Sequence, residues 1–358
     1  MRIGIDGREL CGHSTGVGRY LNGLLQWWSL DAAAADHRFM LYVPEPVASA
    51  PAGPLFEVRV VPGKGGTMWE QGELARAARA DNLDVFFAPA YTAPLTLEIP
   101  LILTIHDVSF VAHPEWFTFR DGLRRRWIVR NAASRARSIV TVSRFSKSEI
   151  VTHLGVPEAR VHVIPQGITT PTSPDGSARD RARLLSVGSI FNRRHIPELL
   201  RAFKRLARRH PDVTLDLVGD NRTYPHVDIT ALLRHLDLTA RVEWHHYVSD
   251  GDLARLYGQS RGFAFLSEYE GLGMTPLEGL AAGLPPVLLD TPVARESCGD
   301  AALYVVLDDV EAIVGALEQV LFDEATRQTL LAAAPAVLRQ YQWPVAARAT
   351  LDLILAHA

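Results

Sequence analysis

Short apolar runs alternate with helical patterns along almost the whole chain, and this alternation constrains the fold more than any other feature. In the first half the strand-like runs lie at residues 3–6, 39–43, 58–60, 85–88, 101–106, 139–142 and 161–164. Helical patterns fill the intervals, most clearly at 18–28, 70–80 and 119–136. Such alternation predicts parallel sheets built from βαβ units, and therefore an α/β protein.

The alternation is interrupted once, by a polar, proline-bearing segment at residues 169–177 that we interpret as a linker. Strand-like runs then resume at 184–187, 214–218, 242–244, 263–266, 286–289 and 303–306, and the chain is helical from residue 310 on. A chain of 358 residues is long enough for two domains. We therefore expect two doubly wound domains with ligands beyond the carboxyl ends of their strands.

Composition excludes several classes of protein. A net charge of −3 argues against binding of nucleic acid by the whole protein. The two cysteines, Cys11 and Cys298, lie far apart and indicate neither a disulfide framework nor a metal cluster, which favours a reducing cytoplasm. No apolar run approaches the ~20 residues of a membrane span, and we expect no signal peptide.

The stretch 268–283, from Glu268 to Gly283, carries the clearest local signal for a binding site. It follows an apolar run at 262–266 that we interpret as a buried strand. Thr275 fits a helix N-cap, Glu278 the third residue of its capping box, and Gly283 a left-handed cap at the helix end. A strand that leads through glycines to a helix N-terminus predicts an anion site, because free N–H groups and the helix dipole favour phosphate.

Two acids lie inside this stretch, Glu270 and Glu278. They would repel a phosphate, so we expect them to contact sugar hydroxyls, since a carboxylate only accepts hydrogen bonds and a diol offers two donors. The alternative for Glu278 is a capping bond to the backbone of Thr275. Glu268 is interpreted as a solvated loop residue.

A basic pair, Arg193 and Arg194, follows the run 184–187 and precedes a helical pattern at 196–209. Two cations there would stabilise the growing charge of a departing diphosphate without proton transfer, and guanidinium groups match phosphate geometry. A solvated helix start is the ordinary alternative. We expect His195 to be structural.

Segments spread over nearly the whole chain, in the same order, resemble glycosyltransferase family 4, whose members are retaining enzymes of the GT-B fold. The stretch 268–283 is similar to the family's E-x7-E motif, and the further similar segments are 3–8, 15–20, 105–107, 141–146, 163–168 and 187–194. The family usually has arginine followed by lysine at the basic pair, so Arg194 changes the geometry of the pair but keeps its charge.

The resemblance implies two Rossmann-like domains facing across a cleft. Residues 1–170 would form the acceptor domain, residues 171–342 the nucleotide-sugar domain, and residues 343–358 a helix that crosses back to the first domain. Catalytic roles are implied for His106, Glu270, Arg193 and Arg194. Donor binding is implied for Gly16, Gly18, Gly188, Arg193, Arg194, Glu270, Gly271, Leu272, Gly273, Met274 and Glu278. Glu278 would contact the ribose and Glu270 the donor sugar.

Two of these features lie in the first half. Gly16 and Gly18 follow the first strand, and we expect a loop whose backbone amides approach the donor, although such a pair alone most often marks a turn. His106 ends a strand-like run, where a packed histidine is the ordinary interpretation. The resemblance implies instead that His106 contacts hydroxyls of the transferred sugar, with its backbone carbonyl as a second contact.

No Asp-x-Asp follows a strand to chelate a divalent metal. We therefore expect transfer without a metal or cofactor, with Arg193 and Arg194 replacing the cation. The resemblance implies retention of configuration, and a front-face mechanism in which the departing phosphate oxygen helps to deprotonate the acceptor fits this set of residues.

A basic run with aromatic neighbours favours two interpretations equally. Its members are Arg120, Arg124, Arg125, Arg126, Arg130, Arg135 and Arg137, mixed with Trp116, Phe117, Phe119 and Trp127. The run is either an anionic-membrane contact or a solvated helix face beside a buried aromatic stripe. The first interpretation would make the protein peripheral at the inner face of the plasma membrane, and the second simply cytoplasmic.

The leading hypothesis is transfer of a hexose, with mannose from GDP-mannose expected, to a polysaccharide or lipid-linked glycan. A nucleotide-sugar epimerase or glycoside phosphorylase on the same fold is the main alternative. A nicotinamide-dependent oxidoreductase would need a third glycine after Gly16 and Gly18, and the two glutamates argue against a non-catalytic subunit.

Overall fold

The computed structural model describes residues 1–12, 16–47, 53–171 and 182–357, except for the side chains of residues 119–121. The described chain forms two compact units. Unit 1 contains Met1–Pro114, Phe119–Gly167 and Tyr341–Ala358, and unit 2 contains Glu115–Thr118 and Ile168–Gln340. The sequence-based division has its boundaries at residues 170 and 343. Residues 172–177 of the expected linker lie outside the described residues.

Unit 1 is built on a seven-stranded parallel sheet with the order β3-β2-β1-β4-β5-β6-β7. Its strands are β1 Arg2–Asp6, β2 Arg38–Val43, β3 Phe56–Val60, β4 Val85–Ala88, β5 Leu101–Thr104, β6 Ser138–Thr141 and β7 Val161–Val163. Each expected strand of the first half is confirmed, with ends that differ by at most two residues.

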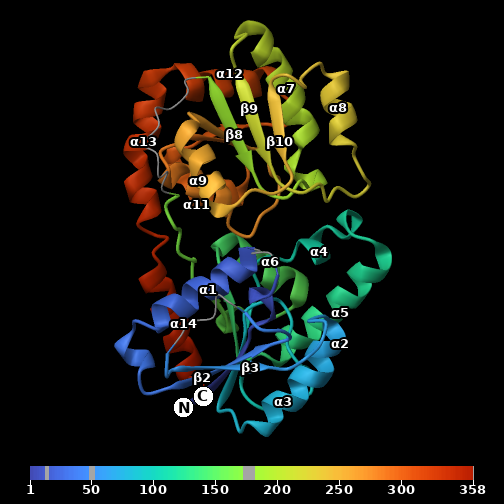
Figure 1. Ribbon diagram of the computed structural model, residues 1–358, viewed down its shortest axis with the longest axis vertical. Coiled ribbons are helices and arrows are strands. Elements are labelled where there is room, and N and C mark those ends of the chain that lie inside the picture. The colour runs from blue at the N-terminus through green and yellow to red at the C-terminus, as the bar shows by residue number, and fades with distance from the viewer. Residues whose placement is uncertain (13–15, 48–52, 172–181, 358) are drawn as a thin grey trace. The chain divides into compact units, whose positions relative to one another are not determined.

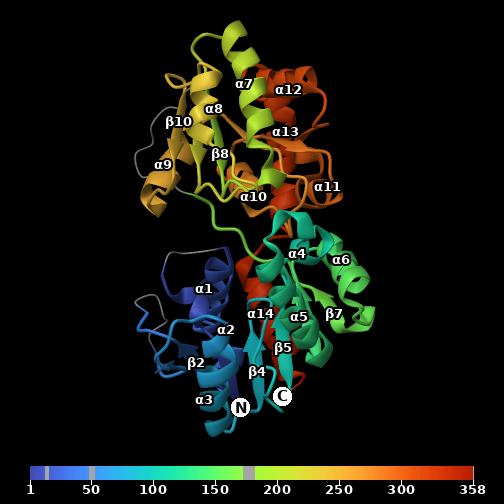
Figure 2. The ribbon, with the colours of Figure 1, turned by 90° about the vertical axis from the view of Figure 1, so that its right-hand side faces the viewer.

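The helices of unit 1 cover both faces of this sheet. They are α1 Gly16–Trp28, α2 Thr67–Trp69, α3 Ala75–Ala80, α4 Ser109–Ala112, α5 Phe119–Arg135, α6 Arg144–Leu154 and α14 Trp343–Leu355. A π-helical turn, Glu70–Leu74, separates α2 from α3. Figure 1 shows α14 beside α1, and Figure 2 shows α5 running along β5.

The last helix packs on unit 1 through the ring of Trp343. A Cβ on Gly23 or Gly167 would lie 2.4 Å or 2.2 Å from that ring, so both positions need glycine. The indole N–H of Trp28 also donates to the carbonyl of Ala347 at 2.8 Å. These contacts explain why the last residues of the chain belong to the unit that holds the first ones.

Unit 2 repeats the architecture with a six-stranded parallel sheet of order β10-β9-β8-β11-β12-β13. The strands are β8 Arg183–Val187, β9 Thr214–Val218, β10 Val242–His245, β11 Gly262–Phe265, β12 Pro286–Leu289 and β13 Leu303–Val305. The helices are α7 Ile196–Arg209, α8 Ile229–His235, α9 Asp250–Gln259, α10 Met274–Ala281, α11 Pro292–Cys298, α12 Val310–Phe322 and α13 Glu324–Leu338. In Figure 1, α7 and α8 lie beside β8, β9 and β10.

Both sheets reverse their strand order once, between β1 and β4 in unit 1 and between β8 and β11 in unit 2. Neighbouring connections leave to opposite faces at such a switch point, which opens a crevice at the carboxyl ends of the two strands. The switch points are therefore where side chains following β1, β4, β8 and β11 can meet a ligand.

Candidate functional site

An ion pair bridges the switch point of unit 2. Arg194 follows β8 and Glu270 follows β11, and Arg194 Nε lies 3.0 Å from Glu270 Oε1. Ser267 Oγ donates to the same carboxylate oxygen at 2.9 Å. The two charged side chains are 14% and 16% exposed, so the pair is sheltered but can be reached from the crevice. The structure thus brings together two residues that stand 76 positions apart in the sequence.

Two glycines leave the space that Arg194 and its supporting backbone occupy. Gly188 has a φ of 133°, and a Cβ there would lie 2.0 Å from Nη1 of Arg194. Gly219, at the end of β9, has a φ of 146°, and its Cβ would lie 2.2 Å from the carbonyl oxygen of Gly188. Arg194 Nη1 donates to the carbonyl of Ser189 at 2.9 Å, and this hydrogen bond holds the guanidinium beside Gly188. Our sequence prediction missed Gly219, although it follows its strand just as Gly188 does.

Arg193 is held differently from Arg194. Its guanidinium carbon lies 4.3 Å from the ring centre of Phe191, and its Nε is buried without a hydrogen-bond partner among the described residues. The backbone N–H of Glu268 donates to the Arg193 carbonyl at 2.9 Å, which ties the arginine turn to the segment after β11. The helical pattern expected at 196–209 is confirmed as α7, and a short 3-10 turn, Asn192–Arg194, precedes it, with His195 in the left-handed conformation between them.

Helix α10 begins one residue before the expected cap. Its N-cap is Gly273, with a φ of 84°, and no side chain of the described residues caps the helix, so the prediction that Thr275 is the N-cap is wrong. Thr275 lies inside the first turn, and its buried hydroxyl has no hydrogen-bond partner among the described residues. The glycine-first start leaves the first turn open to a ligand. The expected cap at Gly283 is confirmed, with a φ of 79° and the N–H of Leu284 bonded to the carbonyl of Gly279 at 2.8 Å.

Glu278 does not form the predicted capping box. Its side chain is 7% exposed, and its Oε2 accepts a hydrogen bond from the hydroxyl of Tyr257 on α9 at 3.2 Å. Tyr257 is fully buried, so it fixes one carboxylate oxygen of Glu278. The other donor residues of this loop differ in exposure: Leu272 is buried, whereas Gly271 and Met274 are partly exposed.

In unit 1 the glycine pair lies in a helix and not in a loop. Gly16 is the first residue of α1 and Gly18 lies in its first turn, so the expected glycine loop is wrong for these two positions. Thr15, which belongs to the same motif, lies outside the described residues. Gly18 is buried and Gly16 is exposed, and a Cβ on Gly16 would meet none of the described residues within 4 Å.

His106 follows β5 and is half-buried. Its Nε2 lies 3.0 Å from the carbonyl oxygen of Pro89, and its backbone carbonyl accepts a hydrogen bond from Ser146 Oγ at 2.9 Å. The imidazole packs edge-on against Tyr20, with 4.9 Å between ring centres. Burial lowers the pKa of His106 from its ordinary value of 6.5, which outweighs the opposite effects of the Pro89 carbonyl and Asp107.

The switch point of unit 1 holds a buried charged cluster that sequence reasoning missed. Arg8, after β1, pairs with Asp6 at 2.9 Å and with Glu70, and it donates to Thr92 Oγ1 at 3.0 Å. Burial raises the pKa of Asp6 to about 6, the positive charge of Arg8 opposes this rise, and Glu70 adds to it. The signal in the sequence was an acid at the last position of the first strand, followed two residues later by an arginine.

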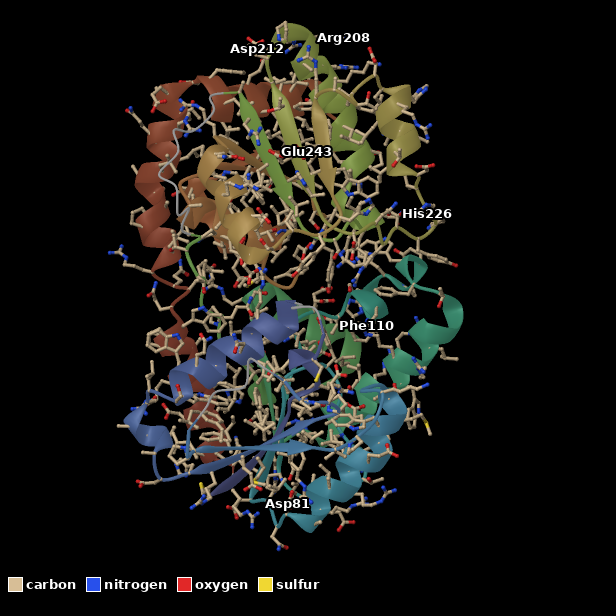
Figure 3. The ribbon with its side chains drawn as sticks, in the orientation of Figure 1. Asp81, Phe110, Arg208, Asp212, His226 and Glu243 are labelled. Atoms are coloured by element: carbon tan, nitrogen blue, oxygen red, sulfur yellow. The ribbon has the colours of Figure 1, made fainter. Side chains whose placement is uncertain are left out.

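A cavity of about 450 Å³ opens in unit 2 near the arginine turn. It is lined by Asp220, Asn221, Arg222, His226, Asp228, Ile229, Thr230, Trp244 and His246. His226 marks the loop before α8 in Figure 3. Asn192 braces this loop, because it accepts from the N–H of Tyr224 at 2.5 Å and donates to the carbonyl of Pro225 at 3.3 Å.

Asp216, Glu243 and His245 of unit 2 offer ligand atoms within 4.8 Å of one another, as a metal ion would require. Figure 3 labels Glu243 on β10. Asp216 is already engaged, since it accepts from Arg183 Nη1 and from His245 Nε2, each at 3.1 Å. A cation bound at Asp216 Oδ1 would have to replace the hydrogen bond from His245 Nε2, and the guanidinium of Arg183 already balances the charge of this carboxylate.

Two family models match the chain in succession. The model described as Glycosyltransferase Family 4 matches residues 15–172, and the one described as Glycosyl transferases group 1 matches residues 173–336. These two models and the two parallel-sheet units identify a GT-B glycosyltransferase. The chain belongs to glycosyltransferase family 4, of the group 1 glycosyl transferases.

Curated relatives include enzymes named as mannosyltransferases. The O-antigen chain mannosyltransferase B of Escherichia coli is 29% identical over 278 residues, 72% of this chain and 71% of the relative. The MMP alpha-(1->4)-mannosyltransferase of Mycolicibacterium hassiacum is 28% identical over 238 residues, 62% of this chain and 56% of the relative.

Solved structures share the fold over the full length. HepE of Anabaena, in complex with UDP and glucose, aligns with a TM-score of 0.75 at 18% identity and covers 100% of both chains. WaaG, a glycosyltransferase involved in lipopolysaccharide biosynthesis, aligns with a TM-score of 0.73 at 16% identity and covers 99% of both.

Proposed function

We propose that the protein transfers a hexose from a nucleoside diphosphate sugar to a glycan acceptor. The observation that carries this proposal is the Arg194–Glu270 pair across the switch point of unit 2, beside the uncapped start of α10. A diphosphate carries the negative charge that Arg194 and the free N–H groups of the helix start favour. Arg194 can release Glu270 when the phosphate arrives, which frees the carboxylate to accept from sugar hydroxyls.

Mannose, supplied as GDP-mannose, is the donor sugar we propose. The support is that relatives from two different organisms are named mannosyltransferases. The acceptor we propose is a growing polysaccharide or a lipid-linked glycan, since one of these relatives is named for an O-antigen chain.

We further propose that transfer retains the anomeric configuration and needs no metal ion. In this mechanism the bond between the anomeric carbon and the β-phosphate oxygen breaks while the acceptor oxygen bonds to the same face of that carbon. The acceptor proton passes to the departing phosphate oxygen. Arg193 and Arg194 would stabilise the charge that develops on the diphosphate, as a divalent cation does in other transferases.

The exposed face of α5 supports a proposal of membrane contact. Leu123 and Trp127 are 53% and 60% exposed, and Arg124 and Arg130 are exposed on the same helix. Arg125 is exposed as well, but its guanidinium packs over the rings of Tyr91 and Phe110, at 5.0 Å and 4.8 Å, so the basic run is not a single face. The side chain of Arg120 lies outside the described residues. Among the described residues no helix is both long and apolar enough to cross a membrane.

Liposome sedimentation tests the membrane proposal. Exposed apolar side chains beside arginines should bind vesicles that contain phosphatidylglycerol and release them as salt is raised. Equal binding to pure phosphatidylcholine vesicles, or none to either, would remove the proposal.

A donor panel tests the transferase itself. Nucleotide release is measured with GDP-mannose, UDP-glucose and other sugar nucleotides, with mannose oligosaccharides as acceptors and with or without EDTA. We expect turnover with GDP-mannose, unchanged by EDTA, and NMR of the product should show the donor's anomeric configuration. An inverted product would refute the mechanism, and hydrolysis, epimerisation or phosphorolysis without transfer would refute the function.

A further inference from the structure

The protonation of His106 follows from the one hydrogen bond that its side chain forms within the described part of the chain. Nε2 lies 3.0 Å from the carbonyl oxygen of Pro89, and a carbonyl can only accept. Nε2 must therefore carry the proton. Burial lowers the pKa of the imidazole, so the ring is neutral near pH 7 and its Nδ1 carries a lone pair.

Nδ1 is the atom that His106 can offer to a ligand. Within the described part of the chain no hydrogen bond reaches it, and it is not among the buried polar atoms left without a partner. The backbone carbonyl of His106 is already bonded to Ser146 Oγ at 2.9 Å. The geometry therefore favours the ring over the carbonyl as the contact for a hydroxyl.

The Pro89 carbonyl belongs to a strained turn after β4. Tyr91 has a φ of 56°, a left-handed conformation that a bulky residue rarely adopts without support. The turn is pinned at Tyr91, whose N–H donates to Thr104 O at 2.8 Å and whose hydroxyl donates to Asp107 Oδ2 at 2.9 Å. Next to it, Thr92 Oγ1 donates to Glu70 Oε1 at 2.5 Å.

Asp107 connects this turn to the histidine segment. It directly follows His106, and its second oxygen accepts from the N–H and the hydroxyl of Ser109 at 2.8 Å and 2.6 Å. The Tyr91–Asp107 hydrogen bond thus joins two segments. Tyr91 belongs to the turn that carries the Pro89 carbonyl, and Asp107 is the residue after His106. The guanidinium of Arg125, 5.0 Å from the Tyr91 ring centre, covers the tyrosine from one side.

We propose that Tyr91 is a positioning residue, which holds the Pro89 carbonyl against His106 so that Nδ1 is presented as a hydrogen-bond acceptor to a hydroxyl of the transferred sugar. The proposal rests on the proposed function, because it assumes a sugar ligand. It assigns His106 no proton transfer: the imidazole keeps its proton on Nε2 and accepts at Nδ1 throughout. A neutral acceptor orients a hydroxyl without adding charge near the anomeric carbon.

The tautomer can be measured without any substrate. Long-range nitrogen–proton NMR of histidine-labelled protein, assigned with His106→Asn, should show the wild-type ring protonated at Nε2 alone at pH 7.5. Tyr91→Phe removes only the hydroxyl, and we expect a mixture of both tautomers. A wild-type ring protonated at Nδ1, or a Tyr91→Phe spectrum identical to wild type, would overturn the proposal.

Tyr42→Phe is the matched control. Tyr42 also donates a buried hydrogen bond to an aspartate, to Asp81 Oδ2 at 2.6 Å. Asp81 lies at the opposite end of unit 1 from Phe110, which packs near Tyr91, as Figure 3 shows. Both substitutions should lower the melting temperature, but only Tyr91→Phe should shift the tautomer and lower kcat, by about tenfold, the size of one well-placed hydrogen bond. An equal loss of kcat in Tyr42→Phe would overturn the proposal.

Two replacements of His106 separate its nitrogens. The asparagine amide reaches the place of Nδ1 and the glutamine amide that of Nε2, so His106→Asn should keep about tenfold more transfer activity than His106→Gln. Both should bind nucleoside diphosphate without sugar as wild type does, because the proposed phosphate contacts lie in unit 2. Equal activities of His106→Asn and His106→Gln would refute only this inference. A wild-type protein that binds no sugar nucleotide would refute the proposed function.

Discussion

The charged side chains at the switch points of the two units differ in how far they are exposed to solvent. In unit 2 the Arg194–Glu270 pair spans the switch point with both side chains about one-seventh exposed. In unit 1 the corresponding place holds Asp6, Arg8 and Glu70, of which the two acids are each 1% exposed. Asp6 has a strongly raised pKa because it is desolvated there.

The difference shows that one architecture can use strand-end charges for two purposes. A sheltered but reachable pair can exchange its partner for a phosphate, because the incoming charge replaces the one released. A buried cluster cannot exchange partners without leaving an uncompensated charge, so it holds the backbone in place. Unit 1 then offers a ligand the neutral His106.

The largest effect is expected from Arg194→Ala. Loss of this cation should lower transfer by about 10²–10³-fold, since it removes a charge that stabilises the leaving group, and should weaken donor binding. Steady-state rates and calorimetric donor affinity measure both. Arg194 variants with wild-type turnover would show that the pair in unit 2 is structural, like the cluster in unit 1.

Asp6→Asn should change how stability depends on pH. The folded state holds a proton on Asp6 up to about pH 6, whereas the unfolded chain releases it near 3.8, so the folded state loses stability as pH rises between these values. The shift corresponds to a free energy on the order of 3 kcal/mol, and the asparagine variant lacks this loss.

Urea unfolding at pH 4, 5, 6 and 7 measures this. The variant should gain stability relative to wild type as the pH rises through this window. A difference that stays constant with pH would mean that Asp6 titrates normally and that the cluster is open to solvent.

Gly188→Ala should displace Arg194 without removing it. The new Cβ would lie 2.0 Å from Arg194 Nη1, at a φ of 133° that alanine rarely adopts. We expect transfer to fall by about tenfold, less than in Arg194→Ala, because the charge remains nearby. Gly315→Ala is the control, since a Cβ on Gly315 would meet no described atom outside the backbone of α12 within 4 Å. Equal kinetics in the two variants would contradict the close packing of Arg194 against Gly188.

The smallest effect is expected from Arg205→Ala. Arg205 pairs with Glu311 at 2.5 Å, but both side chains are more than half exposed. Water and salt screen such pairs, so neither the unfolding midpoint nor the transfer rate should change measurably. A clear loss of activity would mean that charge on α7 far from the switch point also serves the reaction.

Much of the fold was predictable because strand identity depends on local patterns. Every expected strand is present, since parallel strands buried on both faces appear as short apolar runs. The start of α10 was mispredicted for a local reason as well: Thr275 has the chemistry of an N-cap, but Gly273 adopts the left-handed conformation that starts the helix first. Gly16 and Gly18 resembled a loop, yet α1 already includes both.

The sequence by itself determined the two parallel sheets, the family and the residue types at the strand ends, because periodicity and short motifs are local properties. Only the tertiary structure decided which of those residues meet. The pairing of Arg194 with Glu270, the burial of Asp6 beside Glu70 and the contact of His106 with Pro89 all join residues of different segments of the chain. Strand order brings such residues together, and burial then determines whether a charge stays available or becomes part of the framework.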